Sequence, residues 1–349
     1  MGAGVDALIK SMNKDMKCEF ISKGTPAYDY ERIPFTSPRL NYITYGGLPI
    51  GKLIEFYGEN HGGKTTLALD IVANYQLLVH RNSNLPKGVV YADIENTLDP
   101  VWATKLGVNL ESPDYYQINP SSQGAETIFE QITQLMDTGE IGLVVIDSLG
   151  AMESNDEFDN SIEDKTYGGI SLALTKFSKK AEQFCHKYHC TVIGINQERE
   201  KMNSPYGGKK TTGGEAWKFH CSVRMEFRMG KFFDSKGNEL TREAENPVGN
   251  YILVKMIKNK TCPPTRRTGY CTVNYYIGID YLRDLVEVAL KCGIIIQSGA
   301  WFSIVNPETG EQVNKVQGQA KVYEYLGDEN NEETLKDIED YINKQIQED

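Results

Sequence analysis

The fold class of this chain follows from eight consecutive residues, Gly58-Glu59-Asn60-His61-Gly62-Gly63-Lys64-Thr65. They match the pattern GxxxxGK[ST], and they lie between an apolar, strand-like run at residues 53–57 and a helix-like run at 67–75. Glycines let backbone N–H groups close around phosphate oxygens, and the start of the following helix adds the positive end of its dipole. This context favours a phosphate-binding loop over the alternative, a glycine turn without chemistry.

Two side chains of the loop carry the expected chemistry. Lys64 is suited to neutralise the β- and γ-phosphates of a nucleotide, and the Thr65 hydroxyl is suited to hold Mg²⁺. His61 is interpreted as a loop variant rather than a general acid. We therefore predict a nucleotide and Mg²⁺ site whose binding residues include Gly58, Glu59, Asn60, His61, Gly62, Gly63, Lys64, Thr65 and Thr66.

Short apolar segments alternate with helix-like segments along the first two thirds of the chain. Strands are expected at residues 53–57, 88–93, 115–118, 143–147 and 191–196, with helices near 101–106, 125–137 and 171–189. Continuous apolar strands that alternate with helices indicate an α/β fold with a mostly parallel central sheet, covered on both faces. Residues 222–228 and 251–257 alternate like antiparallel strands joined by a turn at 235–238, and 272–277 can pair alongside.

Composition places the chain among soluble intracellular proteins. It has 349 residues with 40% hydrophobic content, enough for one large domain with smaller attachments. No apolar run approaches the roughly 20 residues that span a bilayer, and the first ten residues lack the apolar core of a signal peptide. The seven cysteines include no C-x-x-C pair, which fits a reducing cytoplasm. We therefore expect a cytoplasmic protein without a membrane partner.

Charge is distributed unevenly along the chain. The formal net charge is −11, but residues 328–349 carry nine acidic residues and two lysines, a net charge of −7. Residues 252–271 carry five basic residues and no acidic one. A segment with a net charge of +5 is suited to bind phosphate. The alternative is that these side chains form an ordinary solvated face.

Acidic residues follow two of the expected strands. Asp147 ends the run 143–147, where its carboxylate can support the Mg²⁺ shell through water or Thr65. Its alternative role is a helix N-cap. Asp93 and Glu95 follow another strand, and either carboxylate can polarise the water that attacks the γ-phosphate. Spacing does not choose between these two.

Gln197 follows the expected strand at 191–196. Its amide can sense the γ-phosphate by hydrogen bonding, although the position is also typical of a simple loop amide.

An ordered series of motifs closely resembles the bacterial RecA recombinases. The motifs lie at residues 46–51, 58–65, 93–95, 98–100, 143–148, 195–197, 211–214, 258–260 and 299–301. The resemblance covers nearly the whole chain except the first 30 or so residues and the acidic tail. It implies an N-terminal helix and connector for subunit contact at 1–32, a RecA-type P-loop ATPase core with DNA-binding loops at 33–279, and a small α+β C-terminal domain with the acidic tail at 280–349.

The resemblance also implies roles around ATP. Glu95 corresponds to the catalytic glutamate, and Asp99 and Trp102 correspond to residues that contact adenine. Gln197 corresponds to the glutamine that reports the γ-phosphate to a second DNA loop at 198–212. Lys258 and Lys260 correspond to lysines that reach the ATP of the neighbouring subunit, and Phe219, beside Lys218, corresponds to an intersubunit contact. The catalytic set implied in this way is Lys64, Glu95, Gln197, Lys258 and Lys260.

DNA contacts are implied on two loops. In the first loop, residues 157–169, Tyr167 occupies the position of a methionine that wedges between bases. After this loop, Leu172 replaces an arginine of the family, whereas Lys179 retains a basic DNA contact. The family uses two basic positions to bind a second DNA strand. One of them is occupied by Leu253 in this chain, whereas the other remains basic as Lys255. The implied DNA-binding set is Tyr167, Gly168, Gly169, Lys179, Arg199, Lys201, Lys209, Lys210, Thr211, Gly213 and Gly214.

These implications describe a DNA-dependent ATPase that forms a filament on single-stranded DNA, pairs it with duplex DNA and exchanges strands. ATP and Mg²⁺ are the expected cofactors, and single-strand-binding and loader proteins are further expected partners. One alternative is a helicase or motor ATPase with the same core. The other is a mediator paralogue that exchanges no strands, which the intact set of Lys64, Glu95, Asp147, Lys258 and Lys260 argues against.

The acidic tail allows two interpretations. A flexible acidic segment competes electrostatically with duplex DNA. Alternatively, residues 332–347 form a packed helix whose inward side chains, spaced three and four residues apart, are Leu335, Ile338, Ile342 and Ile346.

Overall fold

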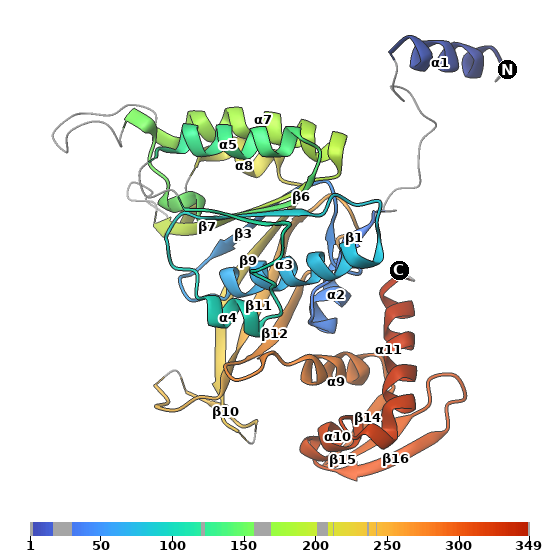
Figure 1. Ribbon diagram of the computed structural model, residues 1–349. Helices are drawn as coiled ribbons and strands as arrows, with labels where there is room; N and C mark the ends of the chain where they lie inside the picture. Colours follow the sequence, from blue (N-terminus) through green and yellow to red (C-terminus); the bar gives the residue numbers. More distant parts are fainter. Residues whose placement is uncertain are drawn as a thin grey trace. The chain divides into compact units, whose positions relative to one another are not determined.

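The computed structural model describes residues 3–16, 30–119, 123–156, 169–200, 209–211, 213–235, 237–241 and 243–347 (Figure 1). The chain divides into two compact units, Met1–Tyr30 and Glu31–Asp349. The first unit contains helix α1 (Ala3–Met16), which confirms the expected N-terminal helix. Its apolar side chains Val5, Leu8 and Met12 are exposed.

The second unit is built around one large sheet. Among the described residues it has eleven strands, and its main path runs β13-β12-β11-β9-β3-β7-β6-β4-β5. Six strands are mutually parallel: β3 (Leu53–Gly58), β4 (Gly88–Asp93), β5 (Tyr115–Ile118), β6 (Ile141–Asp147), β7 (Thr191–Glu200) and β9 (Val223–Phe233). The expected mostly parallel sheet is therefore confirmed.

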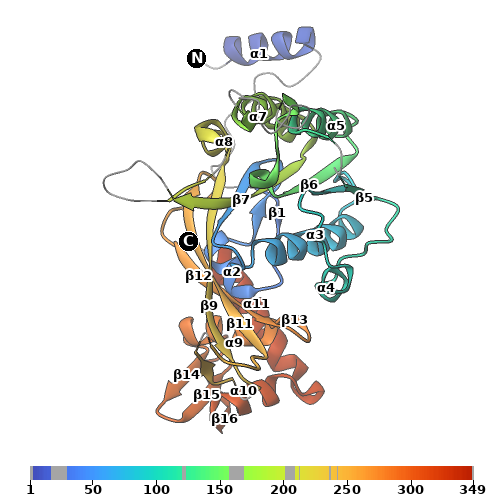
Figure 2. The ribbon, with the colours of Figure 1, turned by 90° about the vertical axis from the view of Figure 1, so that its left-hand side faces the viewer.

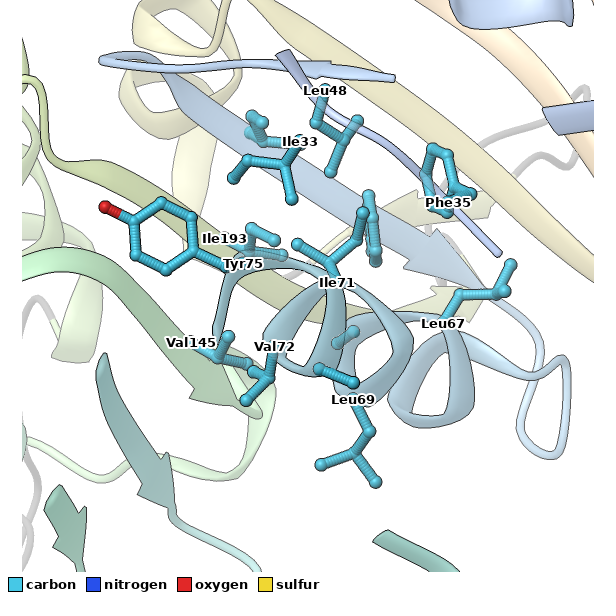
Figure 3. Packing of buried hydrophobic residues seen from close by; sticks show 14 of the residues in the cluster. Ile33, Phe35, Leu48, Leu67, Leu69, Ile71, Val72, Tyr75, Val145 and Ile193 are labelled. Carbon is cyan, nitrogen blue, oxygen red and sulfur yellow. The ribbon is translucent and has the colours of Figure 1, made fainter. Parts of the chain in front are cut away.

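Helices cover both faces of the parallel strands (Figures 1 and 2). Helix α3 (Lys64–Arg81) packs on one face, and α5 (Ala125–Asp137) and α7 (Gly169–Tyr188) cover the other. Side chains of β6 alternate between two cores, with Val145 beside α3 (Figure 3) and Val144 beside α5 and α7. Because both faces are buried, β6 is apolar without interruption from Ile141 to Ile146.

Shorter elements complete this layer. They are β1 (Arg32–Ile33), α2 (Pro38–Thr44), β2 (Leu48–Pro49), α4 (Pro100–Lys105), the 3-10 helix η1 (Leu149–Ala151), β8 (Lys209–Thr211) and α8 (Gly214–His220). No helix in the described ranges is both long enough and apolar enough to cross a membrane.

The antiparallel half of the sheet extends from β9. Strands β11 (Gly249–Asn259), β12 (Thr268–Asn274) and β13 (Gly278–Ile279) follow it in order. The antiparallel pair expected from alternation at 222–228 and 251–257 is confirmed, and the third strand lies alongside but spans 268–274 instead of 272–277. The expected turn at 235–238 was assigned to the wrong pair. It leads from β9 to the short strand β10 (Glu239–Leu240), which pairs with the end of β9, and β11 begins only at Gly249.

The C-terminal region has its own core. It consists of α9 (Tyr281–Lys291), a three-stranded sheet of β14 (Ile295–Ser298), β15 (Trp301–Val305) and β16 (Gln312–Gln317), then α10 (Gln319–Leu326), η2 (Glu329–Asn331) and α11 (Glu332–Gln347). Figure 2 shows this region below the large sheet.

Helix α11 decides between the two interpretations of the acidic tail. Ile338, Ile342 and Ile346 are buried on it, and Leu335 packs partly buried against the same core. The guanidinium of Arg266 donates to the carbonyl oxygens of Gln345 and Ile346, at 3.1 and 3.3 Å. A cation there also suits the negative end of the helix dipole. The packed helix is confirmed, and a flexible segment is wrong for residues 332–347.

A buried carboxyl joins the C-terminal region to the large sheet. Asp284 of α9 accepts hydrogen bonds from the backbone N–H and the hydroxyl of Thr272 on β12, at 3.1 and 2.7 Å, and from the Ser37 hydroxyl. Burial raises the pKa of Asp284 to about 7, although these hydrogen bonds oppose the shift.

Candidate functional site

A cavity of about 910 Å³ opens where the parallel strands end. Residues 60–66 form one side, and Glu95, Trp102, Asp147, Ser148 and Gln197 also line it. Asp147 ends β6 and Gln197 lies in the second half of β7, whereas the other side chains come from segments that follow β3, β4 and β6. They meet because parallel strands place their carboxyl ends at the same edge of a sheet.

Glycine is required in the loop for steric reasons. A Cβ on Gly58, which has φ +144°, would lie 2.1 Å from the Phe227 carbonyl oxygen. A Cβ on Gly63, which has φ +86°, would lie 2.1 Å from the Ile252 side chain. Helix α3 then begins at Lys64, so its free N–H groups face the cavity.

Lys64 lies within the loop with its charge directed at carbonyls. Its ammonium donates to the carbonyl oxygens of Glu59 and Gly58, at 2.6 and 3.3 Å. Burial lowers the pKa of Lys64, while the carboxylates of Asp147 and Glu95 oppose the shift. An anionic ligand can therefore replace weak carbonyl partners with full charges.

Thr65 and Asp147 are in direct contact. The Thr65 hydroxyl donates to Oδ2 of Asp147 at 2.7 Å, and the Tyr91 hydroxyl donates to the same oxygen at 2.9 Å. Burial raises the pKa of Asp147, and both hydrogen bonds oppose the shift. A hydroxyl and a carboxylate are the hard oxygen ligands that Mg²⁺ prefers, so these residues fit the ion.

Glu95 and Asp93 differ in what their carboxylates contact. Oε1 of Glu95 lies at the cavity and accepts from the Ser148 hydroxyl at 2.6 Å and the Gln197 amide at 2.9 Å. Asp93 is buried, and its two oxygens accept from the backbone N–H groups of Thr97 and Leu98, at 3.1 and 3.0 Å. The geometry therefore favours Glu95 as the group that meets water.

The two residues assigned to adenine have different positions. Trp102 lines the cavity, and its indole N–H points at the Thr66 hydroxyl at 3.4 Å. Asp99 is the N-cap of α4, where one oxygen accepts from the N–H groups of Val101 and Trp102. Its visible role is to fix the helix that carries Trp102.

The sequence did not predict the residues that form the opposite wall of the cavity. It is contributed by the antiparallel half of the sheet, through Met229, Phe232, Asn250, Ile252, Val273 and Tyr275. No local motif marks these positions. Only the pairing of β9 with β3, parallel and in register, brings them to the phosphate-binding loop.

Lys258 and Lys260 gather at a second place, around Phe219 at the end of α8. The Lys258 ammonium donates to the carbonyl oxygens of Lys218 and Phe219, at 2.8 and 2.9 Å. Both lysine nitrogens lie 5.8 Å from the centre of the Phe219 ring, which is 75% exposed. Burial lowers the pKa of Lys258, and the neighbouring charge of Lys260 adds to the effect.

Several expected DNA contacts lie outside the described residues. These are Tyr167, Gly168 and Lys201, together with the side chains of Arg199, Lys209 and Lys210. Lys179 is exposed on α7, whose first residue is Gly169, and Thr211 is buried at the end of β8. Gly213 and Gly214 both have left-handed φ values, of 83° and 82°, at the start of α8.

The basic segment at 252–271 is only partly free to meet phosphate. Lys255 is exposed on β11, beside the exposed Leu253. Arg266 is 9% exposed and donates to carbonyl oxygens of Tyr42, Gln345 and Ile346. The expectation that all five cations serve phosphate is therefore wrong for Arg266, which anchors α11.

Comparison with known proteins gives a consistent result. The family model described as RecA N-terminal domain matches residues 5–280. Protein RecA of Fusobacterium nucleatum is 33% identical over 300 residues, covering 84% of this chain and 72% of that protein. Protein RecA of Brucella anthropi is 33% identical over 325 residues, covering 91% and 81%.

A third relative, Protein RecA of Bartonella bacilliformis, is 36% identical over 268 residues, covering 76% and 71%. The solved structure titled Crystal structure of the RadB recombinase aligns with a TM-score of 0.48 and 19% identity, covering 69% of this chain and 95% of that chain. The match to the family model and these relatives show that this chain belongs to the RecA family.

Proposed function

We propose that this chain is an ATP-dependent DNA recombinase, which polymerises on single-stranded DNA, pairs it with homologous duplex DNA and exchanges strands. The observation that carries the proposal is the cavity in which Lys64, Thr65, Glu95, Asp147 and Gln197 converge. Membership of the RecA family supports the step from this cavity to recombination.

ATP is proposed to bind with its phosphates against residues 58–66. Lys64 then exchanges the Glu59 and Gly58 carbonyls for phosphate oxygens. Thr65 and Asp147 would hold Mg²⁺, which when bound neutralises charge on the phosphates. Trp102 offers a ring face to the adenine, and Asp99 keeps that helix in place.

Glu95 is the proposed general base. Its carboxylate orients a water molecule and accepts its proton as the water attacks the γ-phosphate. Ser148 and Gln197 keep the side chain at the cavity through hydrogen bonds to one oxygen, which leaves the other oxygen for water.

Gln197 is proposed to connect hydrolysis with DNA. It lies on β7, which continues through Arg199 to Glu200 and pairs with β8 at Lys209–Thr211. Movement of this ribbon upon DNA binding would shift the Gln197 amide, and with it the carboxylate of Glu95. The proposed DNA contacts remain Tyr167, Gly168, Gly169, Lys179, Arg199, Lys201, Lys209, Lys210, Thr211, Gly213 and Gly214.

Lys258 and Lys260 are proposed to complete the site of a neighbouring subunit. They lie at the end of β11 with the exposed Phe219, and neither is among the residues that line this chain's own cavity in the described part. ATP would then sit between protomers of a filament. In this proposal residues 1–32 contact a neighbour, 33–279 form the ATPase core, and 280–349 form a C-terminal domain.

Electron microscopy with single-stranded DNA and a non-hydrolysable ATP analogue tests the proposal, together with a strand-exchange assay. We expect helical filaments and exchange, both lost in Lys64→Ala. Rings with unwinding that needs no homology would identify a motor ATPase instead. ATP binding without filaments or exchange would identify a mediator.

A further inference from the structure

Tyr91 contacts Asp147, one of the two residues that fit Mg²⁺, from inside the protein. It lies on β4 with 1% of its surface exposed, and its ring belongs to the core between the sheet and α3. Its hydroxyl donates to Oδ2 of Asp147 at 2.9 Å. The strand register brings this about, because Tyr91 pairs with Val145, two residues before Asp147 on the same face of β6.

One oxygen of Asp147 therefore accepts two hydroxyl protons. Thr65 donates at 2.7 Å from the cavity side, and Tyr91 donates from the core side. A hydroxyl that donates its proton still has lone pairs for a cation, so Thr65 can serve both Asp147 and a metal ion. Tyr91 is not among the residues that line the cavity in the described part of the chain, so it can act on the site only through Asp147.

We propose that Tyr91 is a positioning residue for Mg²⁺, whose hydroxyl fixes the rotation of the Asp147 carboxylate so that Asp147 and Thr65 present their oxygens to the ion together. The inference rests on the proposed function of the cavity and extends it to a residue that no local motif indicates. Partners behind a metal-site carboxylate commonly control affinity in this way.

Two other tyrosines, the buried Tyr75 and the partly buried Tyr115, use their hydroxyls differently from Tyr91. The Tyr75 hydroxyl, in the same core, donates to the carbonyl oxygen of Pro86 at 2.6 Å. The Tyr115 hydroxyl, on the neighbouring strand β5, is buried without a hydrogen-bond partner within the described ranges. Both provide matched controls, since Tyr→Phe removes the same atom from side chains that pack in or against the same core.

The test measures binding without turnover. A fluorescent, non-hydrolysable ATP analogue is titrated into the full chain at a series of Mg²⁺ concentrations and in EDTA. Mg²⁺ should raise nucleotide affinity, and the readout is the Mg²⁺ concentration at which half of this increase is reached. For Tyr91→Phe we expect this concentration to rise about 10-fold, which is the lower end of the loss in metal affinity when a partner behind a metal ligand is removed. Affinity in EDTA should equal that of the wild type. Tyr75→Phe and Tyr115→Phe should keep the wild-type Mg²⁺ requirement.

The outcomes separate this inference from the proposed function. An unchanged Mg²⁺ requirement in folded Tyr91→Phe, or an equal shift in Tyr115→Phe, would overturn the inference. Failure of the wild type to bind the analogue would overturn the proposed function instead. The same change is also made in Asp147→Ala, where it should not shift the Mg²⁺ requirement further, and melting of every variant checks that it is folded. A further shift there means that Tyr91 does not act through Asp147.

Discussion

The Gln197 amide donates a hydrogen bond of 2.9 Å to Oε1 of Glu95, 102 positions earlier in the chain. The same oxygen accepts the Ser148 hydroxyl at 2.6 Å. The proposed sensor of DNA and the proposed base are therefore joined through one atom. Any displacement of β7 that moves Gln197 must either break this hydrogen bond or turn the carboxylate.

Gln197→Ala should uncouple hydrolysis from DNA. A hydrogen bond to a charged group contributes about 1.5–3 kcal/mol, so stimulation of ATP hydrolysis by single-stranded DNA should fall about 10-fold or more. Nucleotide affinity should stay close to that of the wild type. Gln117→Ala is the matched control, because that amide bonds to Asn119, an exposed partner outside the cavity lining. Full stimulation in Gln197→Ala would remove Gln197 from the coupling.

Glu95→Gln should separate nucleotide binding from chemistry. The amide keeps the shape of the side chain but cannot accept a proton, so hydrolysis should slow at least about 100-fold while ATP and DNA still bind. Lys64→Ala should lose binding and hydrolysis together. Steady-state hydrolysis and filter binding measure both. Turnover at the wild-type rate in Glu95→Gln would mean that another group is the base, in spite of the backbone hydrogen bonds that occupy Asp93.

Lys258 and Lys260 should act in trans. Mixing Lys258→Ala/Lys260→Ala protein with Lys64→Ala protein should restore part of the hydrolysis that each lacks alone, because some interfaces then combine two intact halves. Lys231→Ala, an exposed lysine on β9 that pairs with Glu239, is the control and should need no complementation. Mixed filaments without any activity would show that the two lysines serve their own chain.

Local sequence was enough to predict one half of the cavity. Lys64 and Thr65 belong to a loop that is fixed by its own glycines and by the strand and helix beside it. Asp147 could be placed because a buried parallel strand ends there. These predictions needed no knowledge of which strands are neighbours.

The other half depends on contacts between distant segments. Ile252 and Tyr275 reach the cavity only because β11 and β12 continue the sheet beyond β9. Asp93 and Glu95 have the same chemistry and nearly the same position in sequence, and only their burial and their hydrogen-bond partners in the folded protein distinguish them. The sequence predicts Arg266 to be a phosphate-binding cation, because its carbonyl partners on α11 lie about 80 residues away in the chain and leave no local signal.

Stability should depend on pH through Asp284. Its pKa is raised from 3.8 to about 7 in the folded state, so the folded protein binds this proton more tightly than the unfolded chain. The stabilisation is complete below about pH 4 and is lost as pH rises through about 7. Asp284→Asn should therefore make the fall in stability with rising pH less steep. Part of the fall should remain, because the pKa of Asp70 is also raised to about 7.

Thermal melting between pH 5 and 8 measures the effect. Asp337→Asn, at a partly exposed carboxyl on α11, provides the control and should leave the slope unchanged. A wild-type melting temperature that rises from pH 5 to 7 more steeply than that of Asp284→Asn would contradict the assignment.

Helix α11 should act as a structural cap rather than as an electrostatic competitor of duplex DNA. Removing the chain after Gly327 exposes the core that Ile338, Ile342 and Ile346 cover and leaves Arg266 without its carbonyl partners. Ile342→Ala alone should cost about 2–5 kcal/mol, and the truncation should lower the melting temperature by about 10 °C or more. Neither change should raise the duplex affinity of the folded protein.

A charge variant separates the two roles of α11, because it removes negative charge and leaves the packed face of the helix intact. Glu332, Glu333 and Asp340 are exposed on α11, so replacing them by Gln, Gln and Asn removes three negative charges without touching the isoleucines. Exposed charges contribute little to stability, so this variant should melt within a few degrees of the wild type. If duplex affinity measured at low salt then rises several-fold, and the gain disappears as salt screens it, the helix also repels DNA. Equal duplex affinity in the two proteins at every salt concentration leaves burial of the three isoleucines as the function of the tail.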